Sequence, residues 1–178
     1  MLQPIDPNVE FIGQSAFNPI LAKPNFIKNN FLKMLEEEGI SDPKLEEWYR
    51  LDSLVRFYKR IEAEYGVNTI FELGKSAADE IVTPEGLETL DKFLEALGPM
   101  YEMNHRNGYA GYFKFVSHNE KEKQIILETY TPYVNDGLRG LFISFIRLYK
   151  TGVRVVRDEE KSSIINGVEN NWYTVSYH

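Results

Sequence analysis

Apolar residues recur every three or four positions through the first 105 residues of the chain, which is the period of an amphipathic helix. Over residues 52–65, for example, Leu54, Tyr58 and Ile61 share one face, while charged residues occupy the other. Glycines and prolines mark where such segments end and begin. The pattern predicts helices over residues 25–38, 43–49, 52–65, 68–81 and 83–97, and, after an interruption at Gly98-Pro99, a further turn or two up to 105.

The period changes from 3.6 to 2 at Asn107-Gly108, which is the change from a helical to a strand pattern. The second half then reads as β-β-α-β-β behind a helical first half. Segregation of this kind predicts an α+β fold in a single domain, an antiparallel sheet with helices packed over one face. The pattern predicts strands over residues 109–117, 124–130, 153–157 and 172–177, and an apolar helix over 136–149.

The charge balance and the residue types narrow the range of functions. The 178 residues include 20 lysines and arginines against 27 acidic residues, which gives a net charge of −7. Because phosphate binding needs clustered cations, nucleic acid is not expected as a partner. The chain has no cysteine, which excludes disulfides, thiolate metal sites and a cysteine nucleophile.

Neither a membrane span nor a signal peptide is predicted. The longest apolar run, over residues 138–148, is interrupted by Arg139 and Arg147 and is shorter than the roughly 18 residues that a span needs. The first seven residues lack the basic start and apolar core of a signal peptide. We therefore expect a cytoplasmic protein.

Known catalytic and metal-binding motifs are incomplete in this sequence. Residues 74–76 (Gly-Lys-Ser) resemble the end of a phosphate-binding loop, but Thr69 stands where that loop needs a glycine. Glu102 and His105 have the Glu-x-x-His spacing of a di-iron helix, without the second copy that such a site requires. A catalytic pair of carboxylates, brought together by the fold, stays an open alternative. The sequence predicts no catalytic residue and no metal ligand, and it favours a protein that is not an enzyme while leaving enzyme activity open.

Aromatic residues are dense where the helical pattern gives way to strands. Rings with polar tips suit a ligand cavity because they supply apolar walls and orienting hydroxyls, and nearby arginines could bind an anionic group. An ordinary aromatic core, with the arginines paired to Asp136 or Glu102, is the alternative. The residues expected to line or gate a cavity are Tyr101, His105, Arg106, Tyr112, Tyr130, Tyr133 and Arg139.

Four stretches together resemble a known group of domains. They are Trp48–Leu51, Tyr101–Phe113, Pro132–Leu141 and the closing Trp172–Tyr177. In sequence and order they resemble an uncharacterised bacterial group related to haem nitric-oxide/oxygen-binding (H-NOX) and four-vinyl-reductase domains. The resemblance covers about residues 45–178. It divides the chain into an N-terminal arm with the first helix, residues 1–40, and an α+β domain over residues 41–178.

The resemblance implies a domain that binds or senses a small, often apolar, molecule and reports to a partner. Haem-binding relatives use a proximal histidine and a Tyr-x-Ser-x-Arg run that holds the haem propionates. Aligning that run on Tyr130 places Pro132 at the serine and Val134 at the arginine. The cysteines that four-vinyl-reductase-like relatives often carry are missing as well. We therefore identify no cofactor and do not expect haem.

The sequence thus favours a non-enzymatic small-molecule binding or sensory domain, with a pocket between the helices and the sheet and an apolar or amphipathic ligand. A protein-interaction or oligomerisation module without a ligand is one alternative, since apolar residues such as Val9, Phe11 and Phe17 lie in the uncovered N-terminal segment. A haem-based gas sensor is the other. The expected partners are a small molecule and either a second copy of the chain or a signalling protein.

Overall fold

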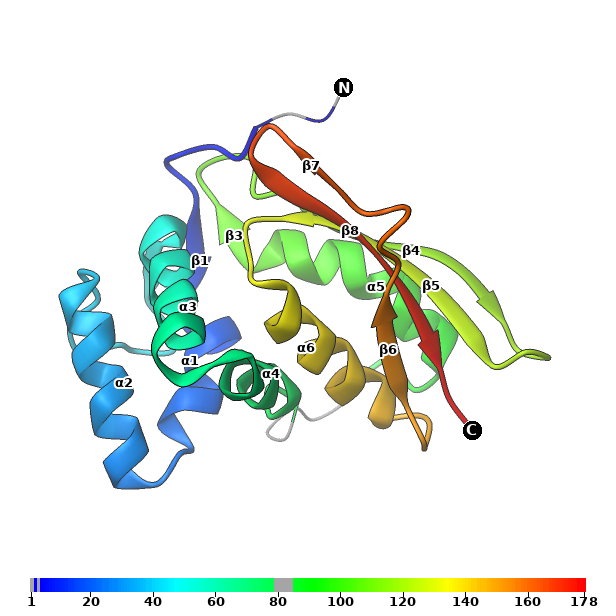
Figure 1. The fold of residues 1–178 in the computed structure, drawn as a ribbon, viewed down its shortest axis with the longest axis horizontal. Coiled ribbons are helices and arrows are strands. Elements are labelled where there is room, and N and C mark those ends of the chain that lie inside the picture. The colour runs from blue at the N-terminus through cyan, green and yellow to red at the C-terminus, as the bar shows by residue number, and fades with distance from the viewer. Residues whose placement is uncertain (1, 3, 79–84) are drawn as a thin grey trace.

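Helices dominate the first half of the chain, as the periodicity predicts. The computed structural model describes residue 2 and residues 4–78 and 85–178. Figure 1 shows α1 to α4 gathered at one side of the molecule and the main sheet at the other. The helices of this half are α1 (Gln14–Leu21), α2 (Asn25–Glu37), α3 (Leu51–Tyr65), α4 (Val67–Lys75) and α5 (Leu90–Met103).

Two of the predicted helices are confirmed and one is wrong. α2 and α3 match the predictions over residues 25–38 and 52–65. The predicted helix over 43–49 does not form, because strand β2 (Trp48–Arg50) pairs antiparallel with β1 (Glu10–Ile12). β1 also pairs with β3 (His105–Arg106), which completes a small sheet of order β2-β1-β3. Backbone pairing between distant segments overrides the local helical signal here.

Helices α4 and α5 differ from their predicted bounds. α4 ends at Lys75 and not near residue 81, and the predicted start of the next helix at residues 83–84 lies outside the described residues. α5 continues through Pro99, where the sequence predicted an interruption. Leu97 and Tyr101, on either side of the proline, are both buried in the core. Their packing outweighs the loss of the N–H that proline lacks.

The second half of the chain folds as β-β-α-β-β, as predicted. The main sheet has the antiparallel order β4-β5-β8-β6, and an additional strand, β7, pairs with β8. β7 lies in the segment that the sequence predicted to be a hydrophilic loop. The elements are β4 (Tyr112–Asn119), β5 (Gln124–Thr131), α6 (Asn135–Arg147), β6 (Arg154–Arg157), β7 (Ser163–Ile165) and β8 (Val168–Ser176).

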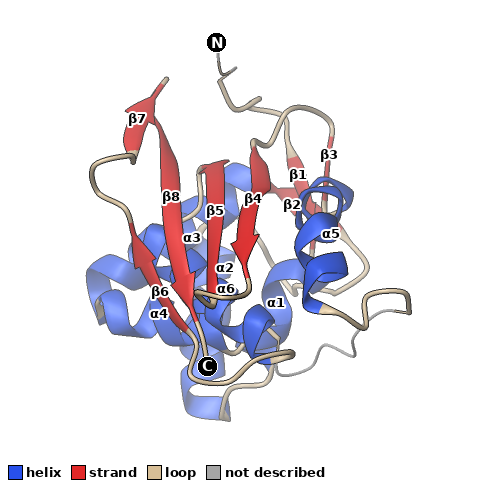
Figure 2. Ribbon diagram, turned by 90° about the vertical axis from the view of Figure 1, so that its right-hand side faces the viewer, coloured by secondary structure: helices blue, strands red, loops and turns tan. Residues whose placement is uncertain are grey.

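Helices cover one face of this sheet. Seen from the sheet side in Figure 2, α4 and α6 lie behind the strands. Phe113 of β4 and Tyr173 of β8 each pack edge-on against Phe142 of α6, with ring centroids 5.3 Å apart. The molecule is therefore a single α+β domain whose core lies between the helices and the inner face of the sheet. No helix in the described residues has both the length and the apolarity to cross a bilayer.

The outer face of the sheet buries one carboxylate. Glu128 on β5 is only 7% exposed. The Tyr112 hydroxyl donates to it at 2.6 Å, the Lys114 ammonium at 3.0 Å and the Asn170 amide at 3.2 Å. Burial by itself raises the pKa of the Glu128 carboxyl, but these three donors outweigh it and hold that pKa below its ordinary value. The ionised carboxylate therefore ties β4, β5 and β8 together.

Replacing Glu128 with alanine is expected to lower the free energy of unfolding by about 1–3 kcal/mol at neutral pH, because the buried Asn170 amide and the partly buried Tyr112 hydroxyl lose their acceptor. A folded-state pKa below the unfolded one contributes stability that is present above the unfolded pKa and is lost as pH falls through the folded pKa. The two proteins should thus converge in strongly acidic solution. Urea denaturation across the pH range measures this, with the exposed Glu122→Ala as the control. If Glu128→Ala lowers the free energy of unfolding by the same amount in acid as at neutral pH, Glu128 is not ionised in the folded protein.

Candidate functional site

A cavity of about 260 Å³ lies between the helices and the sheet. Residues of α1, α4, α5 and α6 form most of its wall, and Tyr58 of α3, His105 of β3, Phe113 of β4 and residues of the connecting segments, among them Tyr133, form the rest. Its volume lies just below the usual range of small-molecule sites, about 300–1,000 Å³. No charged side chain is found among the lining residues in the described part of the chain. The cavity is therefore suited to an uncharged or largely apolar ligand.

The imidazole of His105, just after the C-terminal end of α5, is the most basic group that lines this cavity. Its Nδ1 lies 2.7 Å from the backbone carbonyl oxygen of Tyr101, and its Nε2 lies 2.9 Å from the hydroxyl of Tyr133. Because a carbonyl only accepts, Nδ1 carries the proton and donates, and Nε2 accepts from the Tyr133 hydroxyl. Burial lowers the pKa of His105, against the opposing effect of the Tyr101 carbonyl. The ring is thus neutral and has its lone pair on Nε2.

Three tyrosines add neutral hydroxyls to the same wall. Burial raises the pKa of the phenols of Tyr58, Tyr101 and Tyr133, so all three stay protonated near neutral pH. The Tyr101 hydroxyl donates to the carbonyl of Ala110 at 2.7 Å, which fixes that ring against the segment leading into β4. The ring of Tyr58 lies 6.4 Å from that of Tyr133. The cavity therefore combines apolar surface with a few oriented hydroxyls and one imidazole.

Of the seven residues that the sequence singles out, Tyr101, His105 and Tyr133 line the cavity together. The rings of Tyr101 and His105 stack with centroids 4.3 Å apart, and that of Tyr133 stands edge-on to Tyr101 at 6.4 Å. These three come from the end of α5 and from the segment between β5 and α6. The juxtaposition follows from α5 and α6 packing on the same face of the sheet.

The other four residues lie elsewhere. Tyr112 bonds to Glu128 on the outer face of the sheet, and the buried Tyr130 donates to the carbonyl of Ile165. Both arginines pair with acids: Arg139 pairs with Asp136 at 2.7 Å, as the alternative interpretation of the sequence proposed, whereas Arg106 pairs with Glu10 at 2.6 Å and not with Glu102.

Two parts of the wall were not predicted as ligand-binding. Tyr58 belongs to the apolar face of the predicted helix over 52–65, a pattern that marks a core residue and does not mark a pocket. α1 contributes the polar residues Gln14, Ser15 and Asn18 to this end of the cavity. The only sequence signal for α1 is the helical spacing of Phe17, Ile20 and Leu21.

Comparison with solved structures shows that the chain has the H-NOX fold. A doubly substituted Tt H-NOX domain matches with a TM-score of 0.68 at 13% identity, covering 93% of this chain and 94% of that chain. A single-substitution mutant of the T. tengcongensis H-NOX domain gives 0.66 at 14% identity over 93% and 96%. An oxygen-binding H-NOX domain related to soluble guanylate cyclases gives 0.65 at 13% identity over 92% and 91%. No protein-family model and no curated protein matches the sequence.

These comparisons confirm the resemblance to H-NOX domains at the level of the fold. They also overturn the sequence-based expectation that haem is not a ligand. A further match, to a structure concerned with modulating heme redox potential through porphyrin distortion, has a TM-score of 0.62 at 14% identity. The chain thus adopts a fold that carries haem in other proteins.

Proposed function

We propose that this chain is a sensory domain that binds a small molecule in the cavity, with His105 as the residue that holds the ligand. The observation that carries the proposal is the orientation of the imidazole. The Tyr101 carbonyl keeps the proton on Nδ1, so the lone pair of the ring is on Nε2, where it accepts a hydrogen bond from the Tyr133 hydroxyl. Both residues line the cavity, and none of its lining residues in the described part of the chain is charged. Such an arrangement is poised to coordinate a metal or to accept a hydrogen bond from a ligand.

Haem is the first ligand to consider, because the structural neighbours include haem proteins. His105 fits haem iron, because metal-binding histidines commonly donate one ring N–H to a backbone carbonyl and ligate through the other nitrogen. No lining residue in the described part of the chain supplies a cation for the two haem propionates, so His105 is the residue on which this candidate rests. His105 would hold the iron through Nε2, and the hydroxyl of Tyr133 would leave this nitrogen. Haem would supply an iron centre able to bind a small molecule. The apolar walls would keep water from the iron.

The haem proposal predicts that the metal-free protein, titrated with haemin, develops a Soret band with one equivalent bound. His105→Ala is expected to lose this band, because the nitrogen that would hold the iron is gone, and added imidazole should restore it. His178→Ala, at the exposed end of the chain, is the matched control and should bind as the wild type does. Absorption spectra of the folded variants measure all three.

A failure of the wild type to form the band, or an undiminished band in His105→Ala, overturns the haem assignment. The second candidate is then a neutral small molecule that replaces Tyr133 as the partner of Nε2. This candidate is favoured because Nε2 already accepts a hydrogen bond from a neutral hydroxyl, that of Tyr133, and a ligand hydroxyl or amide N–H would take its place. A library of neutral phenols and amides, screened by thermal shift on wild type and His105→Ala, tests it. If a ligand stabilises His105→Ala as much as the wild type, both candidates are contradicted.

A further inference from the structure

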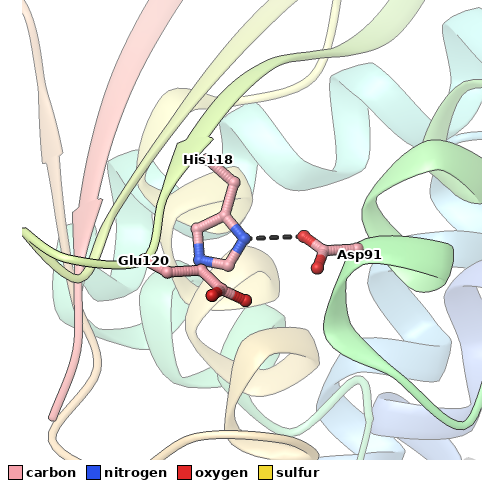
Figure 3. Close-up of side chains that lie close together, drawn as sticks. All are labelled: Asp91, His118 and Glu120. Carbon is pink, nitrogen blue, oxygen red and sulfur yellow. Dashed lines mark hydrogen bonds and ion pairs between the residues drawn. The ribbon is translucent and has the colours of Figure 1, made fainter.

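A second cluster of ionisable side chains lies away from the cavity, at the opposite end of α5 from His105. Asp91 stands in the first turn of α5, His118 lies on β4 and Glu120 follows in the turn after β4. One ligating atom from each of these residues lies within 4.8 Å of the others. Figure 3 shows the His118 ring with the Asp91 carboxylate facing one nitrogen and the Glu120 carboxylate beside it.

The histidine of this cluster is buried and held at both nitrogens. Its side chain is only 5% exposed, whereas that of Asp91 is 54% exposed. Nδ1 lies 2.6 Å from Asp91 Oδ1, and Nε2 lies 2.6 Å from the hydroxyl of Tyr177. The ring is therefore fixed in place from the core side, while the two carboxylates reach it from the solvent side.

We propose that Asp91, His118 and Glu120 form a binding site for a divalent transition-metal ion, with Zn²⁺ as the best-suited ion. One imidazole and two carboxylates are ligands that zinc accepts, and a water would complete four-coordination. His118 would ligate through Nδ1 and donate its Nε2–H to the Tyr177 hydroxyl. That second hydrogen bond is the outer contact that metal-binding histidines commonly make.

The distances are compatible with an ion after small side-chain movements. Zinc bonds of about 2.0–2.2 Å at tetrahedral angles place ligand atoms about 3.4 Å apart. The contact from His118 to Asp91 is shorter than this, and all three ligand atoms lie within 4.8 Å of one another. Asp91 and Glu120 are both exposed, so their carboxylates can rotate without disturbing the core. Only the buried ring has to keep its place.

A bound ion would fasten the start of α5 to the β4–β5 hairpin. α5 also supplies Phe93, Leu97 and Met100 to the wall of the cavity. The ion would therefore hold one wall of the cavity against the sheet. The metal site does not depend on the proposed ligand of the cavity, because none of its three ligands lines the cavity.

Isothermal titration of the chelator-treated full chain with zinc chloride tests the proposal. The wild type is expected to bind one equivalent. Glu120→Gln and Asp91→Asn, which change exposed groups and leave the core intact, should lose this binding, and His118→Gln should lose it as well. Tyr177→Phe should keep the stoichiometry with an affinity lower by about tenfold or more, because only the outer contact is removed.

The controls are Glu122→Gln, which removes a charge from the same turn, and His178→Ala, which removes the imidazole of the last residue. Both should bind zinc as the wild type does. The proposal is overturned if the wild type binds no zinc, or if Glu120→Gln and Asp91→Asn bind it undiminished. In either case the hydrogen bonds from His118 to Asp91 and Tyr177 have a structural role only.

Discussion

Replacing Gly140 with alanine is expected to lower the free energy of unfolding by about 3 kcal/mol, at the upper end of what overpacking costs. Gly140 lies on α6 where this helix touches α4. A Cβ at this position would lie 2.2 Å from the carbonyl oxygen of Phe71 and 2.7 Å from the amide nitrogen of Lys75. Both obstacles are backbone atoms, so no side-chain rotation relieves them, and the helices have to separate.

The same contact continues along the helix pair. A Cβ at Gly74 of α4 would lie 2.0 Å from the carbonyl oxygen of Gly137 on α6. Because both helices line the cavity, through residues such as Leu73 and Leu138, a separation also changes the shape of the ligand site. Thermal and urea unfolding of Gly140→Ala measure the stability loss. A ligand titration of the surviving folded protein measures the effect on the cavity.

Gly137→Ala is the matched control for this prediction. It lies three residues earlier in the same helix, and the nearest atom to its added Cβ is a side-chain carbon of Ile70 at 3.4 Å, an ordinary contact. Alanine in a helix is favoured over glycine by about 1 kcal/mol, so this variant should be as stable as the wild type or slightly more so. Equal losses in the two variants would contradict close backbone packing as the reason.

The sequence predicts the fold well where the signal is local and periodic. The alternation of Phe113 and Phe115 with Tyr112 and Lys114 is enough to predict strand β4, and the apolar run after Asn135 is enough for α6. β1 and β2 were missed because each has three residues, too few for a period to show. Their partners lie tens of residues away, and only the folded chain brings them together.

Only part of the site was predicted, because a local pattern does not show which distant residues the fold brings together. Tyr101, His105 and Tyr133 were found through aromatic density near the helix-to-strand junction, and they meet because α5 and the segment before α6 pack on one face of the sheet. Tyr112 and Tyr130 are directly paired across β4 and β5 on the other face. Strand alternation could have separated them from the first group, because Tyr112 and Phe113 are adjacent and must point to opposite faces.

Replacing Phe17 with alanine is expected to lower the free energy of unfolding by about 3–5 kcal/mol, the usual cost of truncating a fully buried phenylalanine. Phe17 of α1 is 0% exposed. Its ring packs edge-on against Phe11 of β1 at 5.5 Å and Tyr49 of β2 at 5.1 Å. The cluster therefore joins the N-terminal segment to a residue beyond position 40. The division into an arm over residues 1–40 and a domain over residues 41–178 stays a prediction, and this variant tests it.

If the first 40 residues unfold together with the rest, Phe17→Ala shifts a single urea transition seen equally by far-UV circular dichroism and by tyrosine and tryptophan fluorescence. If they form an independent arm, the main transition stays in place and a separate early one shifts. Phe26→Ala is the matched control: its ring is 80% exposed on α2, so its loss should change stability by less than about 0.5 kcal/mol. If Phe26→Ala lowers the free energy of unfolding as much as Phe17→Ala does, burial in the aromatic cluster is not the reason for the loss in Phe17→Ala.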